Sequence, residues 1–368
     1  MIGNRDTSSR CARIDRCVPG RRAVVVRLCL AALAAMTFAS AALPALAADD
    51  AKAMEALIAA AKKEGELVIY SSESDKQVAD TTKAFEAKYG IKVQATRLVG
   101  GAVTSRYAGE RAGNNVVADA IVVANEPFIT DNASWWMPLN ESTVPGYDKF
   151  PAAARGPNFL IMNYNVIGLA WNTNLVKPAD EPKSYLDLVN NPAFAAKGSI
   201  VYADPRATPS AMNLYKILVD KYGEDFFKKL MDRGVAIAAS SSPGVQQIAA
   251  GANKVMIGNF PNNAQSVIAA GGPVKYRPVD DPATGVDNIL AVSAGAKHPN
   301  AARLYAAYRI SPEGQRVMCE AKGSTSPLGD LPGCEPAAPS NYIKTDYRVY
   351  SDKAWQAKYL PWLGLKPL

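Results

Sequence analysis

The sequence predicts an α/β protein with two lobes, and three observations lead to this fold class. Short apolar runs typical of buried strands alternate with segments whose apolar residues recur at helical spacing. A length of 368 residues corresponds to about two domains. Two long strand-like runs, residues 160–171 and 279–293, indicate that the chain passes twice between the lobes. We therefore expect two mixed, largely parallel sheets, each flanked by helices and joined by a two-crossing hinge.

The first lobe is predicted from a β-α-β-α-β order. Residues 50–64 carry apolar side chains at helical spacing, and this helix ends at Gly65. A short buried strand, residues 67–70, comes next. The elements that follow it are a helix over 78–89, a strand over 91–96, a helix over 103–112 and an apolar strand over 120–124. This order is typical of parallel strands whose connecting helices cover the sheet.

The second lobe shows the same style of alternation, beginning near residue 160. The predicted elements are a short helix at 184–188, a strand at 199–203, a helix that includes 212–218, and strands at 235–239 and 254–258, each followed by a helix that opens with proline. A strand at 288–293 and a helix that includes 301–308 follow, and we assign them to lobe 1. The boundaries we expect are 48–160 plus 288–368 for lobe 1 and 161–287 for lobe 2.

Residues 1–47 are expected to be a cleaved signal peptide. Arg21 and Arg22 precede a short apolar stretch, residues 28–38, and Ala45-Leu46-Ala47 forms the small-x-small pattern that is cut before Ala48. The apolar run stops short of the ~20 residues that a membrane span needs. We therefore expect an exported protein of the periplasm, with general secretory and twin-arginine export both open.

The charge of the chain gives no reason to expect a nucleic-acid partner. The net charge is +7, but residues 1–47 hold seven arginines against two aspartates, so the rest of the chain carries +2. A basic patch of the kind that binds a phosphate backbone is therefore not expected.

The cysteines agree with export. Three of the five lie in residues 1–47, which leaves Cys319 and Cys334 in the mature chain. Two cysteines in an oxidising compartment are expected to form a disulfide. Closing a loop of about 15 residues would stabilise the fold by roughly 3 kcal/mol in the chain-entropy model. A catalytic thiol is the alternative interpretation.

Polar residues gather where predicted strands end and helices begin. The candidates at these junctions are Ser71, Ser72, Asn125, Asp204, Arg206, Ser241 and Asn259. In open α/β sheets, ligands bind outside the carboxyl ends of the strands, and helix N-termini favour anions. Capping of the helix is the alternative at any single junction, as at Thr208-Pro209. Five junctions on two sheets favour a shared ligand cleft.

Arg206 is the most informative single charge in this set. It lies between a strand end and a helix start, where a guanidinium can bind a carboxylate or phosphate with two parallel hydrogen bonds. An ion pair with Asp204 is the alternative. Gly101 is a further candidate, because the Gly100-Gly101 loop can approach a ligand with its backbone. Arg97 and Arg106 flank this loop, and either one can be solvated.

Signatures of catalysis, metal binding and cofactor binding are not found. The single histidine, His298, lies before Pro299 at a helix start and has no second histidine with which to form a metal site or a proton relay. The sequence contains no glycine-rich phosphate loop, no zinc-spaced Cys/His set and no calcium loop. We therefore expect a protein that is not an enzyme and that needs no metal or cofactor.

Several segments, taken in their order along the chain, resemble a known family. They are residues 167–175, 182–188, 249–251 with 254–258, 295–302 and 311–315. The mature chain resembles the extracellular solute-binding proteins of ABC importers, in the class with ferric-iron, thiamine, polyamine and phosphonate binders. The resemblance covers about residues 49–330. It implies the type II fold of periplasmic binding proteins and a ligand buried between the lobes. It also implies a monomer that delivers its solute to a permease and ATPase at the inner membrane.

One departure from this family bears on the ligand. Ferric binders of the class carry adjacent tyrosines in the loop after the strand that matches 254–258, whereas residues 259–263 here read Asn-Phe-Pro-Asn-Asn. Tyr164, Tyr202 and Tyr276 can reach the cleft from other segments, and Tyr164 and Tyr276 are retained as candidate ligand residues. We expect a small organic anion such as a carboxylate or phosphonate. The alternatives are ferric iron in an atypical site and an enzyme on the same scaffold, such as a thiamine-degrading enzyme.

Overall fold

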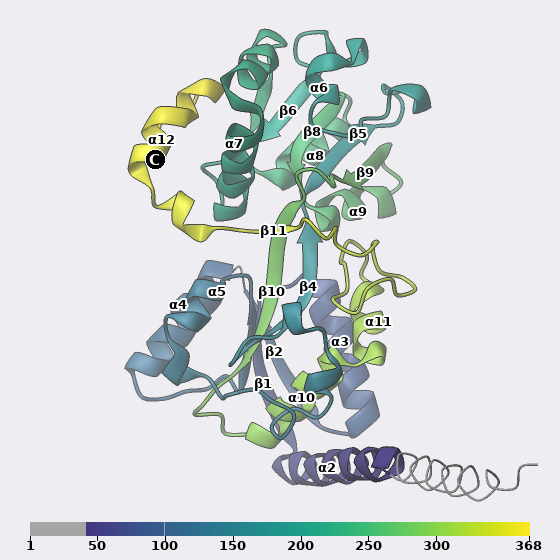
Figure 1. Cartoon of the computed structure of the whole chain (residues 1–368), viewed down its shortest axis with the longest axis vertical. Helices are drawn as coiled ribbons and strands as arrows, with labels where there is room; N and C mark the ends of the chain where they lie inside the picture. Colours follow the sequence, from purple (N-terminus) through teal and green to yellow (C-terminus); the bar gives the residue numbers. More distant parts are fainter. Residues whose placement is uncertain (1–41, 99) are drawn as a thin grey trace, which may run out of the picture. The chain divides into compact units, whose positions relative to one another are not determined.

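The computed structural model describes residues 42–98 and 100–368. The chain divides into two compact units, residues 1–52 and 53–368, and the second unit holds both sheets (Figure 1). The first helix, α2 (Ala42–Glu64), begins in the first unit and ends in the second. The predicted signal peptide, residues 1–47, lies outside the described residues except for 42–47, which form the start of α2.

Two mixed sheets form the framework. The first contains β1 (Glu66–Ser71), β2 (Lys92–Arg97), β3 (Ala120–Val123), β4 (Leu160–Val166), β10 (Thr284–Val292) and β11 (Ile343–Lys344). The second contains β5 (Gly168–Asn172), β6 (Ile200–Ala203), β7 (Ala236–Ala238), β8 (Val255–Asn259) and β9 (Val274–Pro278). Parallel pairs, such as β1–β2 and β6–β8, occur beside antiparallel pairs, such as β10–β3 and β5–β8. The predicted α/β class with two sheets is confirmed.

Helices flank both sheets. Around the first sheet they are α3 (Asp75–Tyr89), α4 (Gly100–Ala112), α5 (Glu126–Thr130), α10 (Pro299–Ile310) and α11 (Pro312–Cys319). Around the second they are α6 (Asp187–Asn190), α7 (Pro209–Asp232), α8 (Ser241–Ala249), α9 (Pro261–Ala269) and α12 (Lys353–Tyr359). Short 3₁₀ turns lie at Ala133–Trp135, Tyr147–Lys149, Ala152–Ala154, Pro178–Asp180, Pro192–Phe194, Tyr347–Tyr350 and Leu360–Leu363.

Local chemistry explains where α3 begins and ends. Ser74 caps the helix by accepting a hydrogen bond from the Gln77 amide, and the Gln77 side chain bonds back to the Ser74 amide. This reciprocal pair satisfies two of the amides that a helix start leaves open. Gly90 ends the helix in the left-handed conformation, at φ 70°, which glycine adopts without a steric penalty.

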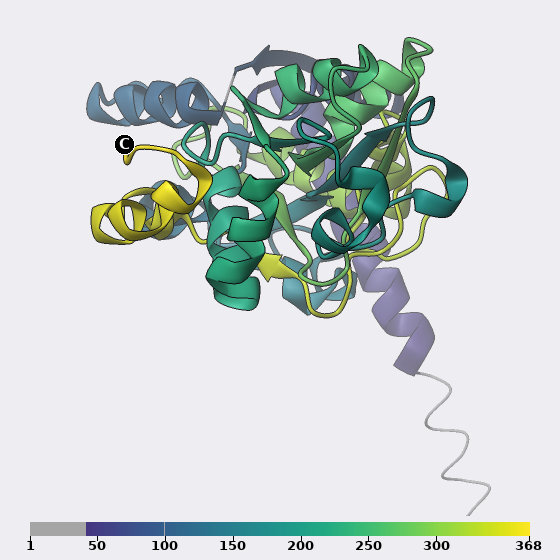
Figure 2. The same ribbon diagram turned by 90° about the horizontal axis from the view of Figure 1, so that it is seen from above.

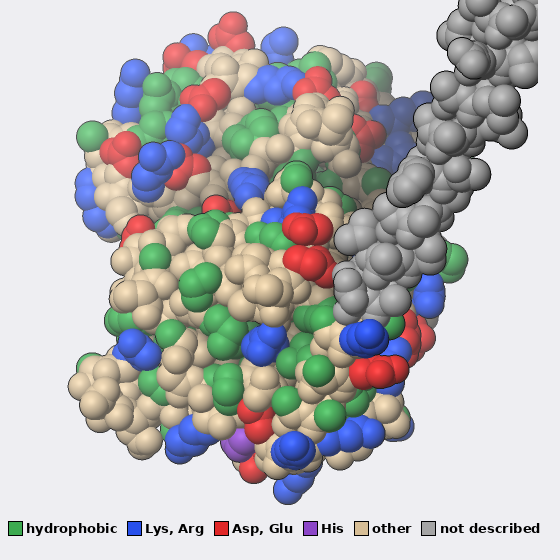
Figure 3. Space-filling model, turned by 60° about the horizontal axis from the view of Figure 1, so that its bottom comes forward, with side chains coloured by type: hydrophobic (Ala, Val, Ile, Leu, Met, Phe, Trp, Pro, Cys, Tyr) green, Lys and Arg blue, Asp and Glu red, His purple; other side chains and the backbone are tan. Residues whose placement is uncertain are grey.

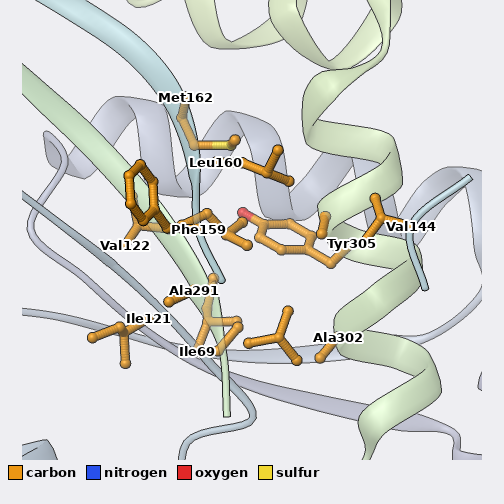
Figure 4. Close-up of a cluster of buried hydrophobic side chains, with 14 of the residues drawn as sticks. Ile69, Ile121, Val122, Val144, Phe159, Leu160, Met162, Ala291, Ala302 and Tyr305 are labelled. Atoms are coloured by element: carbon orange, nitrogen blue, oxygen red, sulfur yellow. The ribbon is translucent and has the colours of Figure 1, made fainter. Parts of the chain in front are cut away.

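The core of the first lobe packs α10 against the sheet. Figure 4 shows the Tyr305 ring of α10 among Leu160, Val144 and Ala302, close to Ile69 of β1. These side chains are buried, and the cluster extends along β3 and β10. Burial of this apolar surface fixes the sheet on which one wall of the candidate site is built.

The second sheet is buried on both faces, as strand alternation requires. Leu169, Ile200 and Ile257 point into a core covered by α7, whereas Ala170 and Met256 point into a second core covered by α8 and α9. Figures 1 and 2 show these helices on the two sides of the strands.

The chain crosses between the sheets at the two predicted places. Ile167 alone separates β4 from β5, so the run predicted as one strand changes sheet at this residue. The second crossing connects β9 to β10 through residues 279–283. Across the hinge, β4 pairs antiparallel with β10 from Val166–Gly285 to Leu160–Leu290 (Figure 1).

The C-terminal segment makes a third passage. After β11, which pairs with β10, residues 345–368 pack against the second lobe, and Val349, Leu360 and Leu363 belong to its core. The sequence-based boundaries assign this segment to lobe 1, because they follow the last strand of the first sheet. Its apolar side chains are instead buried beside α7. We call residues 345–368 the C-terminal strap.

The structure joins Cys319 and Cys334 in a disulfide, as predicted. Within the loop it closes, Ser324 accepts a hydrogen bond from Gln77 of α3 at 2.7 Å and another from Asn163 of β4 at 3.0 Å. The disulfide therefore holds a loop that bonds both to α3 and to a hinge strand.

Alanine substitutions at two glycines, one at the hinge and one in a helix, test the packing of the hinge. A Cβ at Gly168 would lie 2.0 Å from the Arg277 carbonyl oxygen, whereas a Cβ at Gly109 in α4 would meet nothing within 4 Å. Gly168→Ala should therefore lower the free energy of unfolding by about 1–3 kcal/mol through overpacking. Gly109→Ala should raise it by about 0.5–1 kcal/mol through helix propensity. Urea unfolding measures both, and equal stability of the two variants would contradict the packing at this hinge.

Candidate ligand-binding site

A cavity of about 480 Å³ lies between the two lobes. Its lining residues come from both lobes and from the C-terminal strap: Ser72, Glu73, Ser74, Gln77, Arg97, Ala124, Asn165, Thr208, Pro209, Ser210, Phe260, Asn262, Asn263, Val286, Asn288 and Tyr347. Side chains able to hydrogen-bond outnumber apolar ones in this set. The cavity is therefore suited to a polar solute.

The first sheet places its residues at one edge. Strands β1, β2 and β3 are parallel, so the residues at their carboxyl ends, Ser72, Arg97 and Ala124, lie along the same edge. Strand β10 runs antiparallel to β3, which brings its amino-terminal half, with Val286 and Asn288, to that edge as well. This arrangement agrees with the general location of ligands outside the carboxyl ends of strands.

The second lobe contributes the first turns of two helices. Thr208 and Ser210 lie at the start of α7, and Asn262 and Asn263 lie in the first turn of α9. Thr208 caps α7 by accepting from the Ala211 amide at 3.3 Å. The N-terminus of a helix carries open amide groups and a partial positive charge. Together with the start of α3, three helix N-termini meet at the cavity.

A second, smaller cavity of about 170 Å³ adjoins the first. The two share Thr208, Phe260 and Asn263 in their linings. The smaller cavity extends to the start of α8, where residues 240–242 are three serines. A ligand in the main cavity can therefore extend toward α8.

Arg97 is the cation that lines the main cavity within the described residues. Its Nε donates to the Glu73 carbonyl oxygen at 3.2 Å and lies 3.7 Å from an Asp75 carboxylate oxygen that is largely exposed. Both of these contacts are made by Nε, and the two terminal nitrogens of the guanidinium form a pair of donors. A guanidinium offers such paired donors to a planar carboxylate.

A buried ion pair lies directly behind the loop that carries Ser72 and Ser74. Arg309 of α10 donates to both Glu73 carboxylate oxygens, at 2.7 and 3.1 Å, and also to the Tyr305 hydroxyl at 3.0 Å. Glu73 and Arg309 are almost fully buried. Burial alone would lower the pKa of Arg309, but the charges and hydrogen bonds of Glu73 and Tyr305 together outweigh it and raise that pKa. The pair holds the loop in place.

An amide network forms the floor of the cavity near the hinge. Asn288 Nδ2 donates to Asn163 Oδ1 at 3.1 Å, and Asn163 Nδ2 donates to Asn165 Oδ1 at 3.2 Å. Ser324 joins the network through Asn163 and Gln77. These bonds orient Asn165, Asn288 and Gln77, all three of which line the cavity.

Three of the ten sequence-predicted residues line the main cavity or the smaller one beside it. Ser72 lines the main one, and Asp204 and Ser241 line the smaller one. Ser241 donates to Asn259 Oδ1 at 3.2 Å and accepts from the Phe260 amide at 3.0 Å. Asn259 is buried and donates to the Phe260 carbonyl oxygen at 2.8 Å, so it orients the start of α9 from behind.

Arg206 lies apart from both cavities and pairs with Asp204. Its Nη2 lies 2.6 Å from Asp204 Oδ2 and its Nε lies 2.9 Å from Oδ1. Burial acts to raise the pKa of Asp204, but the hydrogen bonds and charge of Arg206 outweigh it and lower that pKa. Arg206 also donates to the Lys366 carbonyl oxygen at 3.3 Å. Of the two interpretations drawn from the sequence, the ion pair is the one seen in the structure.

The remaining predicted residues have structural partners. Ser71 is buried and bonds to Glu73, Gly101 lies in the first turn of α4, and Asn125 caps α5 by accepting from the Phe128 amide at 3.1 Å. Tyr164 packs on Tyr342, and burial with the nearby charge of Asp287 raises its pKa to about 12. Tyr276 donates to the Val166 carbonyl oxygen, and burial raises its pKa.

Sequence reasoning did not select several cavity residues. Asn165, Asn288 and Tyr347 belong to the hinge and the strap, and their place depends on long-range pairing that carries no local pattern. Arg97 was noted only as a neighbour of the Gly100-Gly101 loop. Its signal was its place at the end of a strand parallel to β1, which puts it on the same edge as Ser72.

Two further findings concern metal-binding groups and membrane-spanning helices in the described residues. Within residues 42–98 and 100–368, no group of three or more His, Cys, Asp or Glu side chains could hold a metal ion. Over the same residues, no helix has both the length and the apolar character that crossing a membrane requires.

His298 bonds through Nδ1 to the buried Asp119 at 2.8 Å, and His298 is not among the residues that line the main cavity. On the face drawn in Figure 3, basic and acidic side chains are interspersed.

The comparisons with known proteins agree with this geometry. Residues 80–332 match the model of the bacterial extracellular solute-binding protein family. This match spans more than half of the chain, and the chain belongs to that family. The family predicted from the sequence is therefore confirmed.

Solved structures of similar fold are periplasmic binding proteins. The substrate-binding protein of an ABC transporter from Agrobacterium tumefaciens has a TM-score of 0.65 at 15% identity, covering 81% of this chain and 94% of that one. Iron-bound HitA from Pseudomonas aeruginosa has a TM-score of 0.62 at 18% sequence identity. The match covers 82% of this chain and 99% of HitA. The periplasmic binding protein AfuA from Actinobacillus pleuropneumoniae, with fructose-6-phosphate bound, has a TM-score of 0.58 at 20% sequence identity. The match covers 81% of this chain and 97% of AfuA. At these identities the likeness shows the type II fold.

A buried carboxylate lies on the other face of hinge strand β10. Asp287 is 8% exposed, and its Oδ1 accepts from the Tyr342 hydroxyl at 2.6 Å. Its Oδ2 has no hydrogen-bond partner in the described structure. Burial raises the pKa of Asp287 to about 6, against the opposing effects of Tyr342 and Lys344, and Glu126 adds to the increase.

This pKa predicts a pH dependence of stability. Because the folded-state pKa of Asp287 lies above the unfolded value of about 3.9, the group binds its proton more tightly in the folded state. The contribution of Asp287 to the free energy of unfolding is most favourable below about pH 4 and is lost as the pH rises to about 6. Asp287→Asn should therefore be more stable than the native chain above pH 6, by about 1–3 kcal/mol. Urea unfolding at pH 4, 5, 6 and 7.5 measures this, and parallel curves for the two proteins would contradict it.

Proposed function

We propose that the protein is the periplasmic receptor of an ABC importer and that its solute is a small organic anion such as a carboxylate or phosphonate. The solute occupies the main cavity between the lobes, and the receptor delivers it to a permease and its ATPase in the inner membrane. A monomer exported by a signal peptide cleaved before Ala48 fits this role. Family membership and the fold of the A. tumefaciens relative support the transport role.

The observation that carries the anion proposal is the convergence of positive groups on one cavity. Arg97 lines this cavity, and the N-termini of α3, α7 and α9 meet at the same cavity. The nearest acid of the lining, Glu73, is already neutralised by Arg309. A charge-assisted hydrogen bond in such a setting contributes roughly 1.5–3 kcal/mol.

Ferric iron is the alternative, since the P. aeruginosa relative is iron-bound. The chemistry of the lining favours the anion instead, because Tyr347 is the one tyrosine in the described lining and its hydroxyl donates to the Ala124 carbonyl oxygen. Burial raises the pKa of Tyr347, as do Asp287 and Glu126. The amides of Asn262 and Asn263 are neutral donors and acceptors, which suit an anion better than a trivalent ion.

An enzyme on the same scaffold is the second alternative. A nucleophile and a base within hydrogen-bond reach would be needed in the cavity. The described lining contains neither Cys nor His, and the cysteines form a disulfide. The receptor role is therefore the one we propose.

Arg97→Gln tests the anion proposal. The change removes the guanidinium and should weaken binding of carboxylates or phosphonates by about tenfold or more, because one charge-assisted hydrogen bond is lost. Arg206→Gln is the matched control, since Arg206 lies outside the cavity lining and pairs with Asp204. It should change affinity less than about threefold.

A thermal-shift screen finds the binding anion, and calorimetry then measures the two variants. Ferric citrate is included in the same screen, with visible absorbance as the readout for phenolate coordination. A strong visible band together with anion affinities that are indifferent to Arg97→Gln would overturn the proposal in favour of iron.

A further inference from the structure

The order of strands in the first sheet arranges the cavity lining from cationic to apolar. The strands that reach the cavity edge run in the order β2, β1, β3, β10. Arg97 lies at the end of β2, Ser72 follows β1, Ala124 follows β3 and Val286 lies on β10. Adjacent strands are about 4.8 Å apart, so about 10 Å separates the Arg97 end from Ala124 and about 14 Å separates it from Val286.

Tyr347 belongs to the apolar end. It lies three residues after β11, which pairs with β10 at Thr284 and Gly285, next to Val286. Its hydroxyl donates to the Ala124 carbonyl oxygen, and Ala124, Val286 and Tyr347 all line the cavity. A group of three side chains, Ala124, Val286 and Tyr347, thus forms an apolar wall at the end of the cavity opposite Arg97.

The amides near this wall are bonded to one another. Asn288 donates to Asn163, and the Asn165 side-chain oxygen accepts from Asn163 and from Ser324. Hydrogen-bonding groups that are already engaged contribute less to a polar ligand than open ones do. The Asn165 side-chain oxygen and the Asn288 side-chain nitrogen are therefore already engaged within the network, which reduces the polar groups that this end offers to a ligand.

Tyr347 comes from a part of the chain beyond the family match. The match ends at residue 332, whereas the C-terminal strap begins at residue 345. The strap is held by the Asp346 amide, which donates to Asn213 at 2.9 Å, and by Tyr350, which donates to the Arg206 carbonyl oxygen at 3.0 Å. The apolar wall is therefore completed by a segment that lies outside the family match.

We propose that the solute is an amphipathic organic anion, with its charged group at Arg97 and a hydrocarbon part about 10 Å away against Tyr347. Tyr347 is then the specificity-determining residue that selects for the hydrocarbon part. This inference rests on the anion-receptor function proposed above and adds the class of solute to it. Small inorganic anions and short carboxylates reach Arg97 but not the apolar wall.

Two homologous series test the inference on the full exported chain. The probes are straight-chain carboxylates from acetate to octanoate, with 3-phenylpropionate, and n-alkylphosphonates from methyl to hexyl. Calorimetry or competition measures each affinity. Affinity should rise by about fourfold for each methylene group that becomes buried against the wall, once the chain is long enough to reach it.

Variants of Tyr347 assign the effect to this side chain. Tyr347→Ala should weaken octanoate, the probe long enough to reach the wall, by about tenfold or more and change acetate by less than about twofold. Tyr347→Phe keeps the ring and should retain the chain-length dependence. Tyr350→Phe is the matched control, because this strap tyrosine lies outside the described cavity lining and loses only its bond to Arg206.

Each outcome decides between the two proposals. Affinity that is flat along both series, or a Tyr347→Ala loss that is equal for acetate and octanoate, overturns the amphipathic solute and leaves the anion receptor standing. The equal loss would show that Tyr347 serves only to hold the strap. Failure of every carboxylate and phosphonate to bind overturns both proposals together.

Discussion

The antiparallel pairing of β4 with β10 is the contact on which the rest of the structure depends. Each of these strands belongs to the first sheet and connects directly to a strand of the second sheet, β4 to β5 and β9 to β10. The main cavity lies on the face that carries Asn165, Val286 and Asn288. The opposite face buries Asp287, which accepts from the Tyr342 hydroxyl, and β11 pairs with β10 at Thr284 and Gly285. A change in this pairing would alter the cavity, the hinge and the strap together.

The Glu73–Arg309 pair plays a corresponding part within the first lobe. The Glu73 carboxylate is held by Arg309 of α10, and the Glu73 carbonyl oxygen accepts from Arg97. One residue thus couples a buried helix to the cation of the cavity. Removing one partner of a buried ion pair lowers the free energy of unfolding by roughly 3–5 kcal/mol. Substitution of either Glu73 or Arg309 alone is therefore expected to destabilise the first lobe. Burying two charges is unfavourable by itself, and the structural consequence here is that the loop beside the ligand site is held by Arg309.

The fold and the family could be predicted from the sequence, whereas the site could be predicted only in part. Alternating apolar runs are local, and they indicated both sheets and both crossings. Residues at strand ends were found by the same reasoning, which is why Ser72 and Ser241 line cavities. The roles of Arg206 and Arg97 could not be distinguished, because each follows a strand and only tertiary structure shows that Asp204 neutralises Arg206. Tyr347 carries no local signal at all, since its position depends on the strap crossing to the second lobe.

The central claim is that one cavity between the lobes holds an organic anion by Arg97 and three helix N-termini. A crystal structure of the protein with its bound solute tests it most directly. The account predicts the anionic group within hydrogen-bond distance of the Arg97 terminal nitrogens and of amides in the first turns of α7 or α9. A metal ion coordinated in the cavity, or a solute bound elsewhere with Arg97 left in solvent, would contradict it.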